Sequence, residues 1–369
     1  MPSTRRVSVG MIGAGFIANF SHLPTLCHNP EANVKAICDE NIVQCRETAE
    51  RFHIPKVYNK VDDMLEHEDL QLVDICVPPT RHKDVITSSL QHDVNCLVEK
   101  PLTLKTSDAD DVIALAKAKQ RQLYVIHNYS ALPAMLKAKA MVAAGTIGEV
   151  TGAQVNHFMI FPPRHLDPNH WCHSLPGDYF SEVGPHLAMF LVEFMGRINE
   201  AHAFATKASN HEGVKIDELR IVARSNNVLG TIDCSMNCPS RILTTDIWGT
   251  RGDIHVDADY QAVIYREALD SKMNTKTRGI LALKDIATRI TALGWTSANV
   301  LVGRYQPETT GHRYLIEKCL RAIKGEGQYP IDTSLAREAV HLLELAFQDL
   351  EPNNPRNMPY TMKRKTCTY

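Results

Sequence analysis

A glycine-rich turn that directly follows an apolar strand is the feature that most limits how this chain can fold. Residues 7–18 read VSVGMIGAGFIA, a strand-like run that leads into the pattern G-x-G-x-x-A at Gly13, Gly15 and Ala18. Gly13 permits a tight strand-to-helix turn, Gly15 lets a pyrophosphate approach the backbone, and Ala18 lets the next helix pack close to the sheet. The pattern predicts a dinucleotide bound at the amino end of that helix.

The second apolar run, residues 34–38, indicates which dinucleotide is bound. It ends in Asp39, which follows Gly15 by 24 residues and stands near the position where a carboxylate accepts a hydrogen bond from the adenosine ribose. Glu40 adds a second negative charge, which a 2′-phosphate would meet at short range. We therefore expect NAD in preference to NADP. The alternative is that Asp39 only caps the next helix.

Strand-like and helix-like segments alternate over the first part of the chain, which predicts a parallel sheet covered on both faces. We expect a Rossmann dinucleotide-binding domain over residues 1–127, with strands at 7–12, 34–38, 72–77, 95–98 and 123–126, and helices at 16–27, 41–52, 81–92 and 108–119.

The pattern changes after Asn128. A helix at 133–144 precedes strand-like runs at 150–161, 201–206, 219–225, 228–236, 241–249, 252–256 and 262–265, and helices follow at 312–324 and 335–350. The fold class expected is therefore α/β, with a substrate-binding and oligomerisation domain over residues 128–369 built on a large, mostly antiparallel open sheet. The last fifteen or so residues are expected to form an extended tail.

Residues 276–300 predict an amphipathic helix, because five apolar side chains fall on one helical face. They are Ile280, Leu283, Ile286, Ile290 and Leu293. The helix is expected to pack on its own domain's sheet, and the alternatives are a subunit contact or a lid over the site.

Composition excludes several classes of function. The chain has 369 residues, which is enough for two domains, and a formal net charge of −2, which suggests neither nucleic acid nor a membrane as partner. No signal peptide or apolar run of about 20 residues is evident. Ten cysteines without a C-x-x-C pair predict reduced thiols in a cytoplasmic protein.

Polar residues stand where two strands of the expected parallel sheet end, which is where such sheets bind ligands. Lys100 lies between an apolar strand and a proline, and a partly desolvated lysine there can act as an acid or hold a substrate hydroxyl. The residues expected to contact the cofactor are Gly13, Gly15, Phe16, Ile17, Asp39, Val77, Pro78, Pro79, His82, Glu99, Lys100 and Asn128.

A second polar cluster spans residues 177–186. If a helix begins at Ser181, Glu182 and His186 are four residues apart and share one face. A carboxylate beside an imidazole raises its basicity, and a base near neutral pH is what alcohol oxidation requires. Lys100, His186 and Glu182 are therefore the candidate catalytic residues.

The ordered set of motifs resembles the Gfo/Idh/MocA oxidoreductases, named after glucose–fructose oxidoreductase, inositol dehydrogenase and a rhizopine-catabolism protein. The resemblance covers nearly the whole chain and implies a Rossmann domain, an open-sheet domain and a site between them, with Lys100 as the active-site lysine and His186 as the catalytic histidine. The motifs that carry it are Gly13-x-Gly15-x-x-Ala18, Asp39, Pro78-Pro79-x-x-His82, Glu99-Lys100-Pro101 and Gly177 through His186.

Four positions depart from the family pattern, and two of these departures, Asp178 and the missing Arg, imply a different substrate pocket. Glu182 replaces the usual Asp, Met189 replaces a frequent Asp, Asp178 replaces the second Gly of a pair, and 127–130 lacks a common Arg.

The histidine-rich stretch of His157, His165, Asp167, His170 and His173 resembles a metal cluster. We expect no metal, because the family that the chain resembles generally needs none and because the segment is a proline-rich loop rather than a helix. An aromatic face suits a sugar ring, and an arginine suits a carboxylate or phosphate. The residues expected to contact substrate are Tyr129, Arg164, His165, Trp171 and His173.

Together these observations predict an NAD-dependent dehydrogenase or reductase that acts on a secondary hydroxyl or ketone of a sugar, sugar-nucleotide or cyclitol. One alternative retains NAD and uses transient oxidation to cleave a glycosidic bond. Another is a non-catalytic regulator that senses dinucleotide. A homodimer or homotetramer is expected through the open sheet.

Overall fold

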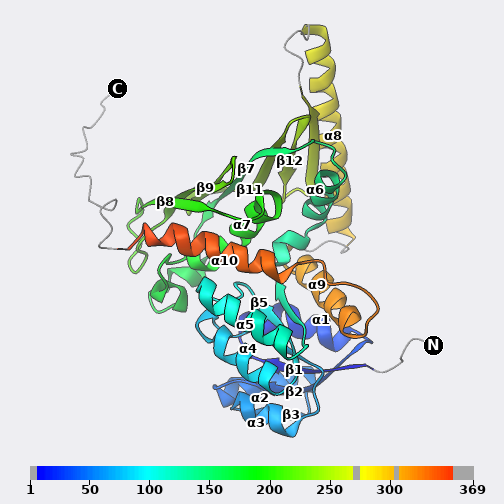
Figure 1. The fold of residues 1–369 in the computed structure, drawn as a ribbon, viewed down its shortest axis with the longest axis vertical. Helices are drawn as coiled ribbons and strands as arrows, with labels where there is room; N and C mark the ends of the chain where they lie inside the picture. Colours follow the sequence, from blue (N-terminus) through cyan, green and yellow to red (C-terminus); the bar gives the residue numbers. More distant parts are fainter. Residues whose placement is uncertain (1–5, 269–274, 303–306, 352–369) are drawn as a thin grey trace.

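The computed structural model describes residues 6–268, 275–302 and 307–351. These residues form two sheet-containing lobes, one above the other in Figure 1, with helices between them. The expected tail at the carboxyl end lies outside the described residues. No helix in the described ranges combines the length and apolarity that crossing a bilayer requires.

The first lobe is a parallel sheet in the order β3-β2-β1-β4-β5-β6. Its strands are β1 (Val7–Ile12), β2 (Ala32–Cys38), β3 (Lys56–Tyr58), β4 (Leu72–Ile75), β5 (Asn95–Glu99) and β6 (Leu123–Ile126). Its helices are α1 (Leu23–His28), α2 (Ile42–Phe52), α3 (Val61–His67), α4 (His82–Gln91) and α5 (Thr106–Ala118). The order reverses between β1 and β4, which places the ligand crevice at the carboxyl ends of these strands.

The predicted strands of this lobe are present, and every residue of β1 is buried, as a sheet covered on both faces requires. Sequence reasoning missed β3 and α3. The strand has only three residues and lies at the sheet edge, where its side chains are exposed or half-buried. So short an edge strand carries almost no periodic signal.

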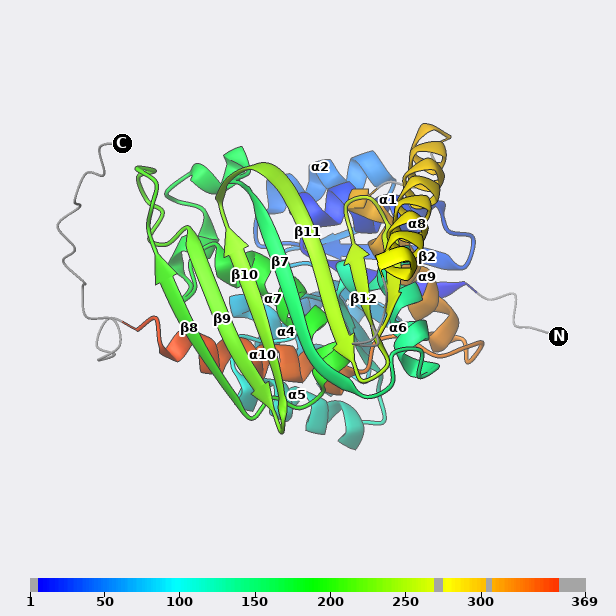
Figure 2. The ribbon, with the colours of Figure 1, turned by 90° about the horizontal axis from the view of Figure 1, so that it is seen from above.

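The second lobe is a seven-stranded sheet in the order β13-β12-β11-β7-β10-β9-β8. Its strands are β7 (Val150–Ile160), β8 (Glu200–Thr206), β9 (Glu218–Ser225), β10 (Val228–Ser235), β11 (Asn237–Gly249), β12 (Gly252–Asp257) and β13 (Ala262–Glu267). Its pairs are antiparallel except β7 with β10, which is parallel. The helix α7 (Phe180–Met195) packs on β7 and β10, and Figure 2 shows the opposite face of the sheet without a covering helix.

The helices at the carboxyl end tie the two lobes together. The helix α9 (Pro307–Ile323) packs near the start of α1, and α10 (Thr333–Gln348) packs on both α7 and α5. Between them the Tyr329 hydroxyl donates to the Val125 carbonyl oxygen at 2.9 Å, and the Thr333 hydroxyl donates to the Leu123 carbonyl oxygen at 2.6 Å. This segment therefore lines the free edge of β6, and helix α6 (Pro133–Ala143) leads from β6 into the second sheet.

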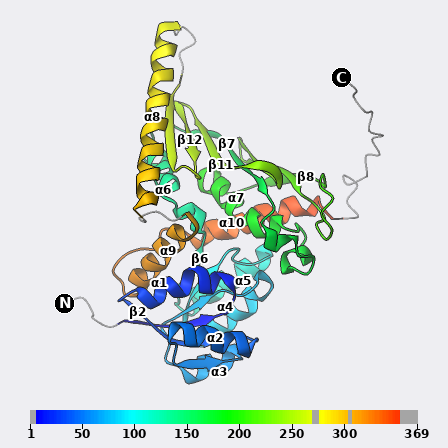
Figure 3. The same cartoon turned by 180° about the vertical axis from the view of Figure 1, so that it is seen from behind.

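The amphipathic helix expected at 276–300 is present as α8 (Thr275–Leu301), which runs along β13 and rises beyond the sheet in Figures 1 and 3. The helix packs on its own domain's sheet, as expected, but its apolar face does not take part in that contact. Leu283 is 66 % exposed and Ile290 is 64 % exposed, whereas Thr296 is buried. The apolar side chains face away from the sheet because the helix contacts β13 through a side that carries both polar and apolar residues.

Candidate active site

The glycine turn has the geometry that a dinucleotide needs. Gly13 has a φ of +103°, and a Cβ there would lie 2.4 Å from the Cys76 carbonyl oxygen, so only glycine fits. A Cβ on Gly15 would meet nothing within 4 Å, so the backbone is open on that side. The Asn19 side chain donates to the carbonyl oxygens of Ala14 and Gly15 and braces the turn. The free amide groups at the helix start can therefore receive a pyrophosphate.

A stretch of π-helix, Ala18–His22, directly follows this turn. Such segments insert an extra residue into a helix and often mark functional sites. Here the segment carries His22 into the protein interior, where its ring is fully buried. The sequence predicted an ordinary helix over 16–27 because the apolar pattern does not distinguish the two forms.

Asp39 lies beside the glycine turn at the end of β2. One of its carboxylate oxygens accepts the Ala14 N–H at 2.7 Å, and the other accepts the Asn41 N–H at 2.8 Å. Each oxygen keeps a lone pair that a ribose hydroxyl can use. The neighbouring Glu40 forms an ion pair with Arg81 at 2.9 Å, a partner that the sequence pattern did not indicate. This residue set fits a dinucleotide with a free ribose 2′-hydroxyl.

Lys100 and Glu182 meet across the boundary between the lobes. Lys100 follows β5, and Glu182 lies in the first turn of α7. The ammonium group donates to the Glu182 carbonyl oxygen at 2.9 Å and lies 3.3 Å from its carboxylate. The side chain of Lys100 is only 10 % exposed, so the pair lies largely out of water. This pairing differs from the expected partnership of Glu182 with His186.

His186 lies one turn further along α7 in a buried environment. Its Nδ1 has no hydrogen-bond partner among the described residues, and its ring stacks on Tyr129 with centroids 4.2 Å apart. Burial, together with the positive charge of Lys100, holds the pKa of His186 well below its usual range. The imidazole is therefore neutral at neutral pH, and the predicted rise in its basicity is wrong, because the ring is buried beside Lys100 and Glu182 pairs with that lysine instead.

A buried ionic network holds the strand end that carries Lys100. His22 Nδ1 lies 2.8 Å from Asp74, and its Nε2 lies 2.9 Å from Glu99. Burial alone would lower the pKa of His22, but Asp74 raises it well above the ordinary value, so both ring nitrogens are protonated. His312 on α9 approaches the same Glu99 oxygen at 3.1 Å.

Glu99 also accepts the N–H of Lys100 at 3.1 Å through its second oxygen. Burial alone would raise the pKa of Glu99, but hydrogen bonds from His22 and His312 hold it well below its usual range. The ionised carboxylate thus joins the π-helical segment Ala18–His22, helix α9 and the backbone of Lys100.

The loop from 163 to 174 is anchored by Asp178. His173 Nδ1 contacts one Asp178 oxygen, and the other accepts the backbone N–H of Lys215 at 2.5 Å. His173 Nε2 in turn donates to the His165 carbonyl oxygen at 2.9 Å. Asp178 is fully buried and has a positive φ of 52°, so the residue that departs from the family's glycine keeps a glycine-like backbone and adds a charge that anchors the loop.

The other residues predicted to contact substrate have distinct environments. Both ring nitrogens of His165 are buried without a partner among the described residues, whereas those of His173 are used within the loop. Arg164 lies over the Phe16 ring at 4.6 Å and so bridges the loop to the glycine turn. Trp171 is half-buried beside His170.

The remaining residues predicted to contact the cofactor surround the same strand ends. His82 is buried, with one ring nitrogen 2.7 Å from the Pro101 carbonyl oxygen and the other 3.0 Å from that of Val77. Burial lowers its pKa, and its ring joins the two loops that carry Pro78 and Lys100. Asn128 is buried against α9, and Ile17 and Val77 are half-buried while Pro78 is exposed and Pro79 buried.

Sequence reasoning missed several polar residues at this junction. His127, at the end of β6, is buried with neither ring nitrogen partnered among the described residues, and burial lowers its pKa to about 3. Tyr179 is buried against the rings of Phe161 and His165. The position of His127 directly after a strand is a sequence signal that could have identified it. His22 and His312 lie within helical segments, where no such signal exists.

Among the described residues, three groups of side chains have the composition of a metal site. They are His22, Asp74 and Cys76; His22, Glu99 and His312; and Cys172, His173 and Asp178. In each, the ligand atoms lie within 4.8 Å of one another. The hydrogen bonds described above account for the carboxylates and for most of the imidazole nitrogens in these groups.

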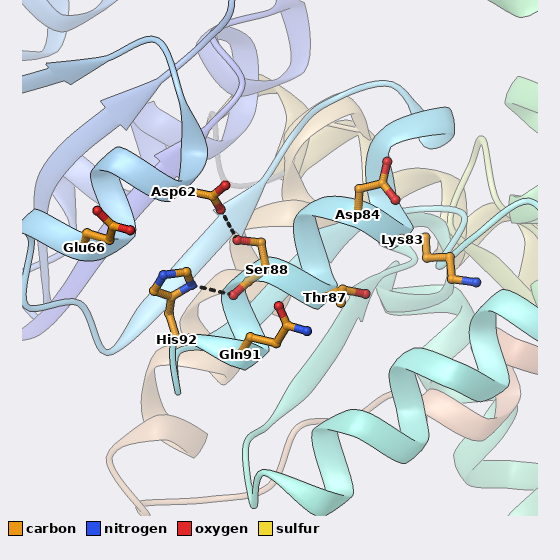
Figure 4. A pocket seen from close by; sticks show the side chains of 8 residues that line it. All are labelled: Asp62, Glu66, Lys83, Asp84, Thr87, Ser88, Gln91 and His92. Carbon is orange, nitrogen blue, oxygen red and sulfur yellow. Dashed lines mark hydrogen bonds between the residues drawn. The ribbon is translucent and has the colours of Figure 1, made fainter.

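A surface hollow of about 500 Å³ lies apart from these residues, between α3 and α4. Figure 4 shows its lining, which includes Asp62, Lys83, Ser88 and His92. None of its lining residues belongs to the predicted site, so we assign it no part in the chemistry.

Comparison with known proteins identifies the class. Residues 7–127 match the profile of the oxidoreductase family with an NAD-binding Rossmann fold, and residues 135–255 match the GFO/IDH/MocA C-terminal domain. The chain belongs to this family of NAD-binding oxidoreductases, as the sequence motifs predicted.

Individual relatives are distant. An uncharacterised oxidoreductase of Schizosaccharomyces pombe is 30% identical over 42% of this chain and 43% of its own length. D-apiose dehydrogenase of Paraburkholderia graminis is 24% identical over 71% of each chain. The crystal structure of the WlbA dehydrogenase of Bordetella pertussis, in complex with NADH and UDP-GlcNAcA, has a TM-score of 0.75 at 16% identity and covers 94% of this chain and 96% of that chain. At this identity the structural match shows the shared fold.

Proposed function

We propose that this protein is an NAD-dependent dehydrogenase or reductase that acts on a secondary hydroxyl or ketone of a sugar, sugar-nucleotide or cyclitol. The observation that carries the proposal is the pairing of Lys100 with Glu182 at the carboxyl end of β5, with His186 one turn further along α7. The glycine turn at the end of β1 fits a dinucleotide. The names of two relatives, D-apiose dehydrogenase and a dehydrogenase crystallised with UDP-GlcNAcA, support a carbohydrate substrate.

The chemistry divides between the cofactor and the protein. NAD, when bound, supplies the hydride acceptor or donor at its nicotinamide ring. Lys100, held by Glu182, is placed to donate a hydrogen bond to the reacting oxygen. His186 is neutral and has a free ring nitrogen, so it can accept the hydroxyl proton during oxidation and return it during reduction.

The substrate's remaining groups are proposed to meet the loop that Asp178 anchors. His165 offers two unpartnered ring nitrogens, and Tyr129 and Trp171 offer aromatic faces for a sugar ring. Arg164 is exposed beside Phe16 and suits a carboxylate or phosphate on the substrate. His173 and His82 use their ring nitrogens within the protein, so we assign them a role in shaping the site.

The proposal is tested with the full-length protein and a stereochemically broad set of sugars, sugar-nucleotides and cyclitols, with NADH absorbance as the readout. Turnover with at least one of them, lost in Lys100→Met, is the expected result. The retaining-glycosidase alternative would instead show NAD that copurifies and cleavage of a glycoside without net NADH. Dinucleotide binding without turnover of any compound in the set would overturn the proposal in favour of a regulator.

We further propose a homodimer or homotetramer formed through the open face of the second sheet, in a cytoplasmic protein divided at residue 127. Phe204, Leu229 and Trp248 expose apolar side chains on this sheet. Light scattering at micromolar concentration is expected to give a multiple of the chain mass, and Leu229→Asp is expected to reduce it. A concentration-independent monomer would contradict the assembly.

A further inference from the structure

Helix α8 presents two different faces. The side chains that turn toward β13 are Leu281, Asp285, Thr288, Ala292 and Thr296, which are half-buried or buried. Their spacing of three or four residues defines one side of an α-helix. The opposite side carries six large apolar side chains, which we call the α8 stripe: Ile280, Leu283, Ile286, Ile290, Leu293 and Leu301. A helix normally buries such a stripe, and here it faces outward.

The stripe extends along most of the helix. Its members are between 42% and 85% exposed, and they extend over a helix that is about 40 Å long. Together they expose roughly 600 Å² of apolar surface, which is at the upper end of what a monomer leaves in water and is typical of an interaction site. Ordinary scattered surface leucines do not form such an array.

Charge distribution identifies the kind of surface that fits. Within Thr275–Leu301 the charged residues are Lys276, Arg278, Lys284 and Arg289, which are exposed, and Asp285, which is half-buried against the sheet edge. Lys284 borders the stripe on one side and Arg289 on the other, whereas Arg278 lines the hollow between α8 and β13, with Lys284 at its edge. An apolar stripe flanked by basic residues, with the one acid turned inward, matches an anionic and apolar boundary such as the headgroup region of a membrane.

The place of α8 in the fold makes this face accessible. The helix lies at the edge of the second sheet, and its upper part rises clear of the strands in Figures 1 and 3. A hollow of about 660 Å³ separates it in part from β12 and β13. The helix is therefore attached along one side only and presents the stripe on the far side.

We propose that α8 docks this protein onto an anionic lipid membrane, with the helix lying in the interface plane and the α8 stripe inserted among the acyl chains. Pairing with α8 of a second copy fits less well. In such a pair, each helix would bring four exposed basic side chains to the contact. Neither helix has an exposed acidic side chain to pair with them. The inference adds a membrane contact that overall composition did not predict.

The experiment is cosedimentation of the full-length protein with vesicles of phosphatidylcholine alone and with about a third of phosphatidylserine. Binding to the phosphatidylserine vesicles is expected, with weakening at about 0.5 M salt. The double substitution Leu283→Asp/Ile290→Asp is expected to abolish binding, and Lys284→Glu/Arg289→Glu to weaken it by about tenfold or more. These side chains are exposed, so circular dichroism should show an unchanged fold.

A matched control is Val43→Asp, which places the same charge at a residue that is 64 % exposed on α2 in the first lobe, away from the α8 stripe and from the sheet face proposed for assembly. It is expected to bind vesicles like the unchanged protein. Absence of vesicle binding or equal binding to neutral vesicles would overturn the proposal. So would a third result: the unchanged protein does not bind vesicles, and Leu283→Asp/Ile290→Asp has a smaller particle mass by light scattering. The last would assign the stripe to a second copy of the chain.

Discussion

The ammonium group of Lys100 contacts Glu182 twice, at the backbone carbonyl oxygen 2.9 Å away and at the side-chain carboxylate 3.3 Å away. These contacts link the end of a Rossmann strand to the first turn of a helix in the second lobe. They orient the lysine toward α7, whose next turn carries His186.

We expect Lys100→Met and His186→Ala each to lower kcat by ~10²–10⁴, because removing an acid–base group acts on the transition state. NAD affinity should stay near normal in both variants, as fluorescence titration can check. Glu182→Gln should cost less, because it retains the carbonyl contact with Lys100. Near-full turnover by His186→Ala would mean that this histidine is structural and that another group moves the proton.

Lys100 also affects the titration of His186. Burial and the positive charge of Lys100 both lower the pKa of His186, so Lys100→Met should raise that pKa toward its ordinary value. Imidazole NMR signals, assigned by comparison with His186→Asn, report this titration without requiring activity. An unchanged or lower pKa in Lys100→Met would show that the two side chains do not interact through charge.

Asp39 and Glu40 should determine the preference for NAD over NADP. Asp39→Ser removes the carboxylate proposed to accept a hydrogen bond from the ribose and is expected to narrow the difference between the two dissociation constants. Glu40→Ala frees Arg81 from its 2.9 Å ion pair and should strengthen NADP binding, because a guanidinium favours a phosphate. Calorimetric titration of both cofactors measures this, and tighter binding of NADP by the unchanged protein would refute the preference.

Asp178 should act on substrate binding through the loop that it anchors. Asp178→Asn keeps a side chain that tolerates the positive φ but removes the charge that pairs with His173. We expect KM for the best substrate to rise by about tenfold or more, a loss of about 1.4 kcal/mol, with NAD affinity unchanged. Steady-state kinetics distinguishes this from a general defect, in which kcat and cofactor affinity would fall together.

Buried neutral histidines should make the protein sensitive to acid. Burial lowers the pKa of His157 to about 4, below the value of about 6.5 expected in the unfolded chain. Between pH 6.5 and 4 the unfolded state therefore binds a proton that the folded state does not bind. The stabilisation of the folded state is complete above pH 6.5 and is lost as the pH falls toward 4.

In His157→Gln the free energy of unfolding should therefore fall less steeply between pH 6.5 and 4. The slope against pH should be smaller by up to the contribution of one bound proton. Urea denaturation at several pH values measures this slope. His127 and His165, whose pKa values burial lowers to about 3, should keep the remaining slope steep. An equal slope in His157→Gln and the unchanged protein would contradict the assignment.

Local patterns in the sequence were sufficient to predict most of the fold. The glycine turn at 13–18 and the runs of buried apolar residues placed β1, β2, β4, β5 and β6, and the alternation after residue 150 placed β7 to β13. These features depend on neighbouring residues, because glycine conformation and period-two burial are properties of a few consecutive positions. The ends of parallel strands meet at one sheet edge, which is why the sequence could assign the candidate site residues to that edge.

Only the tertiary structure decided which side chains become partners. Glu182 could face His186 by helical spacing, yet its carboxylate lies beside Lys100, 82 residues away in the chain. His22 and His312 meet at Glu99 although no local pattern connects them. The α8 stripe was visible in the sequence, but its outward direction was not, because periodicity defines a face and does not determine what covers that face. Such relationships depend on how separate elements pack together, and packing is set by contacts between residues far apart in the chain.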